Sequence, residues 1–210
     1  NMNIVIIGTG YVGLVTGVGL ANLGNVVNFI DLDENKIKDL SNKKITFYEP
    51  GLEEYFNDDE TFKRMSFSSD YASIEWDNID IVFVCVQTPN NIETNSVDTK
   101  FLESAIKEIN NVNSNDLVIT VKSTIPPYEI EKVCEKVGMD SSKLTFNPEF
   151  LREGTAVEDF FKPDRIVLGG TDTEKLTKLK ELYSGFDCEI ITTDSISSQL
   201  IKYLANTYLP

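Results

Sequence analysis

The stretch IVIIGTGYVG, residues 4–13, decides the fold. Its apolar run at residues 4–7 predicts a buried strand, and a GxGxxG turn follows at once. A stretch rich in small residues then predicts a helix, and a second apolar run at residues 26–30 predicts the next strand, which ends at Asp31. Strand, glycine turn, helix, strand and acid, in this order, predict a Rossmann-like unit that binds a dinucleotide.

The glycine turn and the start of its helix have separate roles in such a unit. Gly8 permits the tight turn, Gly10 lets the backbone approach a pyrophosphate, and Gly13 lets the helix pack close to the strand. We expect the first backbone N–H groups of the helix, around Tyr11 and Val12, to face the phosphates together with the positive end of the helix dipole.

Asp31 predicts the choice of cofactor. A carboxylate at this position accepts hydrogen bonds from the ribose 2′-OH and repels the 2′-phosphate of NADP, so NAD is the expected cofactor. The alternative is a glycine-rich turn that only packs a helix on a sheet. Both strands, the helix and the acid together favour the nucleotide site.

The composition is that of a soluble globular domain, and it limits the partners. The 210 residues carry 19 Lys and Arg against 34 Asp and Glu, a net charge of −15, which argues against binding nucleic acid or anionic lipid. We expect no membrane span and no signal peptide. Three cysteines without CxxC spacing predict reduced thiols in a cytoplasmic protein, with no metal site. The absence of His excludes His-dependent catalysis within this chain.

Strand and helix patterns alternate along the chain, which predicts a doubly wound α/β domain with a mostly parallel sheet. Further strands are predicted at residues 65–67, 79–86, 117–121, 144–146, 165–168 and 189–191. Further helices are predicted at residues 34–40, 52–56, 99–109, 126–137 and 173–183, with a polar loop at 90–96. A last helical pattern starts at Ser195, so we divide the chain into a domain at residues 1–193 and a helix start at 194–210.

Polar clusters follow five of the predicted strands. Ligands of open α/β sheets bind beyond the carboxyl ends of the strands. The clusters are residues 8–10, Asp31, Thr88-Pro89, Ser123-Thr124 and residues 147–149. Any one of them would be explained as a turn, but five on one edge predict one shared site.

Longer motifs make the chain similar to the UDP-glucose/GDP-mannose dehydrogenase family. They are IVIIGTGYVGL (residues 4–14), EPGLEE (49–54), VQTP (86–89), VKSTIPP (121–127), the segment from NPEF to VLGG (147–170) and LIKYLANTYL (200–209). In order and spacing they resemble the N-terminal half of the family over essentially the whole chain. FLREG followed by PDRIVLGG most resembles the UDP-glucose members, whereas the GDP-mannose and UDP-N-acetylmannosamine branches usually differ in this segment.

This resemblance implies an activity and a cofactor. The family oxidises the C6 alcohol of the sugar to a carboxylate with two NAD+, here a four-electron oxidation of UDP-glucose to UDP-glucuronate. The second oxidation needs a cysteine nucleophile, which in the family lies in a Gly-rich motif that is absent from this sequence. We therefore expect the nucleotide-sugar domain to be missing here and these residues to be inactive alone. Residues 194–210 correspond to the start of the central helix through which the family forms homodimers.

The resemblance also implies catalytic roles, position by position. Thr124 and Glu149 match the pair that positions water and moves protons, and Glu153 matches a second acid near the nicotinamide and the reacting sugar carbon. Lys202 and Asn206 match the lysine and asparagine that hold the oxyanion charge at C6.

Further matched positions concern binding. Phe150, Leu151 and Arg152, beside Glu149, match the segment that lines the nucleotide-sugar pocket, and Lys36 matches a basic contact to the adenosine side of NAD. The remaining expected cofactor contacts lie at the strand ends and in the acidic segment: Thr88, Ser123, Thr124 and Glu153.

Two alternatives remain open. A sister dehydrogenase would act on GDP-mannose or UDP-N-acetylmannosamine. A non-catalytic module would sense NAD and regulate a partner, but it would need only the glycine turn and Asp31. The two acids and the Lys202–Asn206 pair would have no role in such a module.

Overall fold

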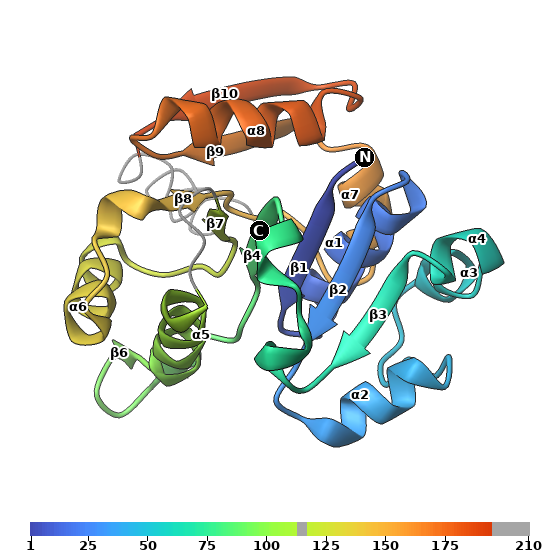
Figure 1. Cartoon of the computed structure of the whole chain (residues 1–210), viewed down its shortest axis with the longest axis horizontal. Coiled ribbons are helices and arrows are strands. Elements are labelled where there is room, and N and C mark those ends of the chain that lie inside the picture. The colour runs from blue at the N-terminus through green and yellow to red at the C-terminus, as the bar shows by residue number, and fades with distance from the viewer. Residues whose placement is uncertain (113–116, 195–210) are drawn as a thin grey trace.

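The computed structural model describes residues 1–112 and 117–194 (Figure 1). The helix predicted from Ser195, which carries Lys202 and Asn206, lies outside the described residues.

An eight-stranded sheet forms the centre of the domain (Figure 1). Across the sheet the strands are β10 (Glu189–Thr193), β9 (Arg165–Gly169), β8 (Leu144–Phe146), β7 (Val118–Val121), β4 (Ile81–Val84), β1 (Asn3–Ile7), β2 (Val26–Ile30) and β3 (Met65–Ser68). Neighbours are parallel except β8 and β9, which pair antiparallel. The chain runs outward from β1 to β3 and then restarts at β4 on the other side of β1. The strand order therefore reverses between β1 and β4, where ligands of such sheets bind.

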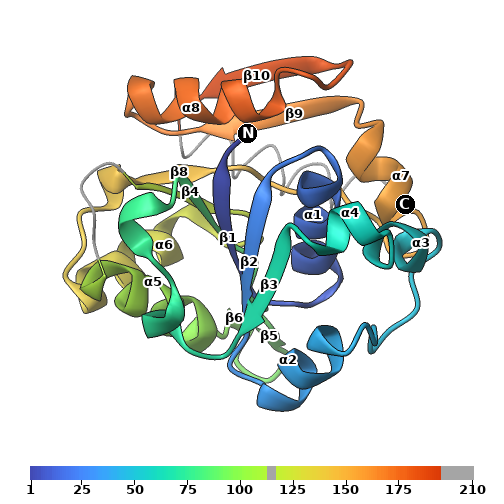
Figure 2. The ribbon, with the colours of Figure 1, turned by 45° about the vertical axis from the view of Figure 1, so that its right-hand side comes forward.

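Helices cover both faces of the sheet (Figure 2). One face packs against α1 (Tyr11–Asn22), α3 (Leu52–Phe56), α7 (Ala156–Phe161) and α8 (Thr173–Tyr183). The opposite face packs against α5 (Lys100–Asn111) and α6 (Pro127–Val137). Two shorter helices, α2 (Glu34–Ser41) and α4 (Asp59–Phe62), contact β3 and α1 respectively. Single 3₁₀ turns cover Tyr71–Ser73, Trp76–Asn78 and Ser141–Lys143.

The continuous apolar runs are explained by burial on both faces. Ile4 and Ile6 of β1 belong to the core layer under α1, and Val5 and Ile7 belong to the layer under α5. All four are at most 3% exposed. Because successive strand residues point to opposite faces, a strand covered on both sides needs apolar residues at every position.

Local signals in the sequence set the helix ends. Asp33 caps α2 by accepting hydrogen bonds from the backbone N–H groups of Asn35 and Lys36. Pro127 begins α6, and Gly138 ends it in the left-handed conformation at φ 80°.

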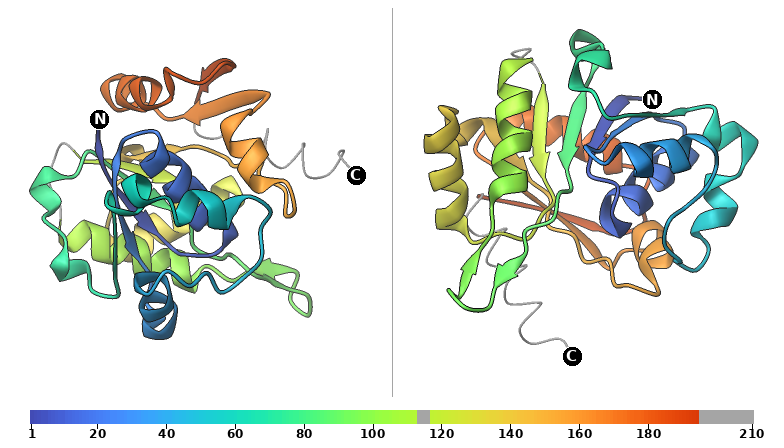
Figure 3. Two further views of the ribbon diagram at one scale, coloured as in Figure 1. Left: turned by 90° about the vertical axis from the view of Figure 1, so that its right-hand side faces the viewer. Right: turned by 90° about the horizontal axis from the view of Figure 1, so that it is seen from below.

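The predicted α/β fold is confirmed, with three differences in detail. The predicted polar loop at 90–96 contains a hairpin of β5 (Asn90–Asn91) and β6 (Ser96–Val97) that projects from the domain (Figure 3). Strands of two residues are too short for an alternating pattern to reveal them. The helices α4 and α7, of four and six residues, were not predicted. The strand predicted at 79–86 is shorter, since β4 has only four residues.

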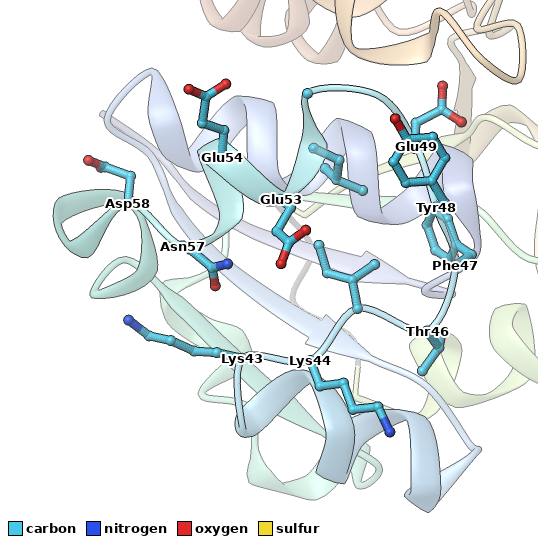
Figure 4. Close-up of a pocket in the computed structure, with 13 residues that line it drawn as sticks. Lys43, Lys44, Thr46, Phe47, Tyr48, Glu49, Glu53, Glu54, Asn57 and Asp58 are labelled. Carbon is cyan, nitrogen blue, oxygen red and sulfur yellow. The ribbon is translucent and has the colours of Figure 1, made fainter.

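The start of α7 is held by a distant part of the chain. Glu49 Oε1 accepts a hydrogen bond from the backbone N of Ala156 at 3.0 Å, and Glu49 is 5% exposed. Glu49 ends a loop that borders an open hollow beside α3, and Lys43 lies at the other end of that hollow (Figure 4). A buried carboxylate thereby satisfies one of the unpaired N–H groups of the first helical turn.

We expect Glu49→Ala to lower the free energy of unfolding by about 1–3 kcal/mol, because the buried N–H of Ala156 loses a charged acceptor. Urea denaturation measures the effect. Glu53→Ala is the matched control, since Glu53 is an exposed acid on the neighbouring helix. Equal stability of the two variants would show that Glu49 does not hold α7.

Candidate functional site

The five predicted polar clusters lie at one edge of the sheet. They follow β1, β2, β4, β7 and β8, which are all parallel, so their carboxyl ends point the same way. The glycine turn lies at the end of β1, beside the point where the strand order reverses.

Two glycines of the turn are required by close packing. Gly8 has φ 99°, and a Cβ on it would lie 2.6 Å from the carbonyl oxygen of Cys85. A Cβ on Gly13 would overlap the carbonyl oxygen of Gly8. Both contacts are with backbone, which cannot move aside, so α1 can approach β1 and β4 this closely only without side chains at these positions.

Gly10 differs from both, because it faces open space. Its φ of −69° is ordinary for any residue, and a Cβ there would have no atom within 4 Å. Gly10 is also the N-cap of α1, and its carbonyl oxygen accepts the first helical hydrogen bond from Leu14. The N–H groups of Tyr11, Val12 and Gly13 precede that bond, so they have no acceptor within the helix. The open surface and these donors form a site for an anion.

Asp31 anchors the glycine turn. Its Oδ2 accepts hydrogen bonds from the backbone N and the hydroxyl of Thr9, at 2.9 and 2.7 Å. Its Oδ1 accepts from the backbone N of Asp33 at 2.9 Å. The carboxylate is therefore held at the end of β2 by both of its oxygens. This anchoring role was not predicted, although Thr9 lies within the glycine motif.

A cavity of about 320 Å³ opens between the ends of β1, β2 and β4. Four of the predicted cofactor residues line it: Gly8, Gly10, Asp31 and Lys36. Apolar and aromatic side chains, Tyr71, Phe101 and Ala105, form another part of its wall. None of the three was predicted. Phe101 and Ala105 lie on α5, where a core position and a ligand-facing position look alike in an amphipathic pattern, and Tyr71 lies in a single 3₁₀ turn without a periodic pattern.

The hydroxyls predicted at the ends of β4 and β7 cross-link the two loops. Thr88 Oγ1 donates to the carbonyl oxygen of Thr124 at 2.8 Å, and Ser123 Oγ donates to that of Val86 at 2.7 Å. These bonds tie Thr124 to the loop after β4, whose Val86 and Gln87 line the cavity. Whether Thr88 and Ser123 also contact the cofactor stays a prediction.

The acidic segment after β8 lies against the start of α1. The Tyr11 hydroxyl donates to the carbonyl oxygen of Leu151 at 3.4 Å. Burial, followed by the negative charges of Glu149, Glu153 and Glu49, raises the pKa of Tyr11 to about 12. Both predicted catalytic acids are thus brought close to the glycine turn, although 136 residues separate Gly13 from Glu149 (149 − 13).

Within this segment the predicted residues have different surroundings. Glu149 is half-buried, and its Oε2 accepts from the backbone N of Leu151 at 2.8 Å. Glu153 is exposed. The Arg152 guanidinium forms an ion pair with Asp159 at 2.8 Å, so Asp159 fixes this side chain at the surface. Phe150 and Leu151 line a second, smaller cavity together with Glu149.

The cysteines do not provide a nucleophile among the described residues. Cys85, Cys134 and Cys188 form no disulfide, and the first two are buried. Burial raises the pKa of the Cys85 thiol to about 12, and burial with Asp140 and Glu131 raises that of Cys134 to about 11. A thiol with such a pKa carries almost no thiolate at neutral pH.

Residues 1–112 and 117–194 contain no cluster of three or more His, Cys, Asp or Glu side chains that could hold a metal ion. No helix in these ranges is long and apolar enough to cross a membrane.

Comparison with known proteins identifies the domain. Residues 2–187 match the UDP-glucose/GDP-mannose dehydrogenase family, NAD binding domain. The chain belongs to this family. The resemblance found in the motifs is therefore confirmed, and NAD is the cofactor of this domain. The residues present fit NAD, because Gly10 leaves open space beside unpaired helix N–H groups and Asp31 stands at the end of β2.

Relatives with known names cover the chain almost completely. UDP-glucose 6-dehydrogenase of Rickettsia prowazekii is 37% identical over 99% of this chain and 49% of its own length. UDP-glucose 6-dehydrogenase of Bacillus subtilis is 38% identical over 99% of this chain and 48% of its own length. This chain thus spans about half the length of the curated relatives it matches.

Solved structures of the family share the fold. A UDP-glucose dehydrogenase from Pyrobaculum islandicum superimposes with a TM-score of 0.89 at 33% identity, over 99% of this chain and 50% of its own. A GDP-mannose dehydrogenase from Pseudomonas aeruginosa superimposes with a TM-score of 0.88 at 28% sequence identity. The match again covers 99% of this chain and 50% of the other.

We expect Gly10→Ala to weaken NAD+ binding by about tenfold or more, because a methyl group would occupy the surface that the pyrophosphate approaches. The free energy of unfolding should stay within about 1 kcal/mol, since the backbone conformation suits alanine. Calorimetric titration and urea denaturation measure the two quantities.

Gly13→Ala is the matched comparison. Its methyl group would overlap backbone, so stability should fall by about 1–3 kcal/mol. Unchanged NAD+ affinity in Gly10→Ala would place the pyrophosphate elsewhere.

Proposed function

We propose that this chain is the NAD-binding half of an enzyme that oxidises UDP-glucose to UDP-glucuronate with two NAD+. The observation that carries the proposal is the contact between the glycine turn and the acidic segment, in which the Tyr11 hydroxyl donates to the carbonyl oxygen of Leu151, between Glu149 and Glu153 in the sequence. A module that only senses NAD needs no carboxylates at that place. The names of the relatives at 37–38% identity support UDP-glucose as the substrate.

In this proposal the chain's residues bind the cofactor, position the sugar and move protons. NAD+ accepts the hydride when it is bound. Gly8, Gly10 and Gly13 shape its pyrophosphate site, and Asp31 accepts the ribose hydroxyl. Lys36 contacts the adenosine side.

The reacting end is assigned to the ends of β7 and β8. Thr124 and Glu149 position water and take up the proton of the sugar hydroxyl, and Glu153 lies near the nicotinamide. Phe150, Leu151 and Arg152 line the nucleotide-sugar pocket. The hydrogen bond from Leu151 to Glu149 supports this assignment, because it restricts the carboxylate to one orientation.

The proposal extends to the domain arrangement. Residues 1–193 would form the NAD-binding domain, and residues 194–210 would begin a central helix through which the complete enzyme forms a homodimer. A cytoplasmic location fits the cysteines at positions 85, 134 and 188, none of which forms a disulfide among the described residues.

The rival substrates are GDP-mannose and UDP-N-acetylmannosamine. The complete enzyme should reduce two NAD+ per molecule of UDP-glucose, followed as NADH at 340 nm, and should prefer UDP-glucose to both rivals. These 210 residues alone should give no turnover, because they lack the catalytic cysteine motif. If the enzyme prefers GDP-mannose or UDP-N-acetylmannosamine, the proposed substrate is wrong. If it binds NAD+ but oxidises none of the three nucleotide sugars, the result favours the NAD-sensing module.

In the complete enzyme, Lys202→Ala should lower kcat by about 10²–10³ with little change in NAD+ affinity, because a fixed ammonium stabilises the oxyanion that grows as hydride leaves. Steady-state kinetics measure both parameters. Lys107→Ala, at an exposed lysine on α5, is the control. If kcat of Lys202→Ala stays within a few-fold of the wild-type value, Lys202 has no role in the oxidation.

A further inference from the structure

Thr9, the second residue of the glycine turn, directs both of its hydrogen-bond donors at one oxygen of Asp31. Its backbone N and its hydroxyl donate to Asp31 Oδ2 at 2.9 and 2.7 Å. Thr9 is 2% exposed, whereas Asp31 is half-buried, and both residues line the cavity of about 320 Å³ at the ends of β1, β2 and β4. The turn therefore holds the carboxylate in the wall of this cavity.

The two oxygens of Asp31 differ in the acceptor capacity that remains. A carboxylate has about four lone-pair sites, two on each oxygen. Oδ2 uses both of its sites on Thr9, and Oδ1 uses one on the backbone N of Asp33, at 2.9 Å. One site on Oδ1 remains for a ligand. A ribose hydroxyl that enters the cavity thus meets a single acceptor, and the direction of that acceptor depends on Thr9.

The backbone at both ends of this contact is fixed by other bonds. The N–H of Gly8 donates to the carbonyl oxygen of Ile30 at 2.8 Å. The N–H of Asp31 donates to the carbonyl oxygen of Ser68 at 3.2 Å. The freedom that remains is rotation of the Asp31 carboxyl group about its last bond, a torsion with broad minima in aspartate. The Thr9 hydroxyl restricts that rotation, so its effect falls on the direction of the acceptor.

We propose that Thr9 is a positioning residue for the cofactor: its hydroxyl orients the carboxylate of Asp31, so that the remaining site on Oδ1 faces the 2′-hydroxyl of the adenosine ribose. A group that is held in its binding orientation before the ligand arrives loses less freedom on binding, which raises the affinity for NAD+. The inference rests on the proposed function, in which Asp31 accepts the ribose hydroxyl.

Filling the space at this position does not require a hydroxyl. Valine has nearly the shape of threonine, and the backbone N of residue 9 would keep its own bond to Asp31. Thr16 on α1 offers a comparison, because it is 0% exposed and its Oγ1 has no hydrogen-bond partner among the described residues. The two buried threonines are therefore a matched pair for substitution by valine, and of the two only Thr9 donates to Asp31.

The test measures how much the 2′-hydroxyl of the cofactor contributes to binding. The complete enzyme that contains this chain is titrated calorimetrically with NAD+ and with 2′-deoxy-NAD+, which lacks that hydroxyl on the adenosine ribose. Thr9→Val removes the donor and keeps the shape of the side chain, Thr9→Ser keeps the donor, and Thr16→Val is the control. The midpoint of thermal unfolding is measured for each variant.

The wild-type enzyme should bind NAD+ about tenfold or more tightly than 2′-deoxy-NAD+, because the analogue lacks a hydrogen bond to a charged acceptor. Thr9→Val should weaken NAD+ binding about three- to tenfold and leave the affinity for 2′-deoxy-NAD+ within about twofold. The preference for NAD+ should thus shrink. Thr9→Ser should restore most of it, and Thr16→Val should leave it unchanged.

A purely structural role of the Thr9 hydroxyl gives a different result. If the hydroxyl only holds the glycine turn, Thr9→Val weakens both cofactors by the same factor, the preference stays, and the inference is wrong. A preference that Thr9→Ser does not restore, or an equal loss of preference in Thr16→Val, would also overturn it. If Thr9→Val unfolds below the temperature of the titration, Thr9→Ala gives the same comparison with a smaller side chain.

Failure of the proposed function has its own signature. Equal affinity of the wild-type enzyme for NAD+ and 2′-deoxy-NAD+ would contradict the role given to Asp31 in the proposed function, and this inference with it. A wild-type preference for NAD+ that persists undiminished in Thr9→Val contradicts this inference alone.

Discussion

The close approach of α1 to the sheet is the constraint on which the rest of the structure depends. Gly13 meets the carbonyl of Gly8, and Gly8 meets the carbonyl of Cys85, so at these positions the backbone of α1 lies directly against the chain at the ends of β1 and β4. This contact aims the start of α1 at the cleft where the strand order reverses. In the proposed binding mode the helix dipole and the N–H groups of the first turn face the phosphates of NAD without later rearrangement.

Most of the fold could be predicted because its signals are local. A strand buried on both faces is a continuous apolar run, and Asp33, Pro127 and Gly138 mark helix ends by their own chemistry. The hairpin of β5 and β6 and the helix α7 could not be found in this way. The strands of the hairpin have only two residues each, and the start of α7 is held by a distant residue, through the bond from Ala156 to Glu49.

The candidate site could be predicted only in part, for a related reason. The glycine turn and Asp31 form a local motif with a known geometry. The roles of Glu149, Glu153 and Thr124 came from resemblance, and the structure adds that Leu151, which lies between the two acids in the sequence, contacts Tyr11. The hydrogen bonds that join Lys122, Asn147 and Tyr183 could not be predicted, although Lys122 and Asn147 lie within quoted motifs, because the three residues are far apart in the sequence and meet only after folding.

The reversal of direction between β8 and β9 has a mechanical consequence. In the main sheet β8 and β9 pair at one position only, Phe146 with Gly169. Every other pair of neighbouring strands has three to five paired residues. Asn147 crosses it through its bond to Val167. The outer strands can therefore act as a separate cooperative unit, and a local opening there would release the base of the acidic loop while the nucleotide-binding half of the sheet stays folded.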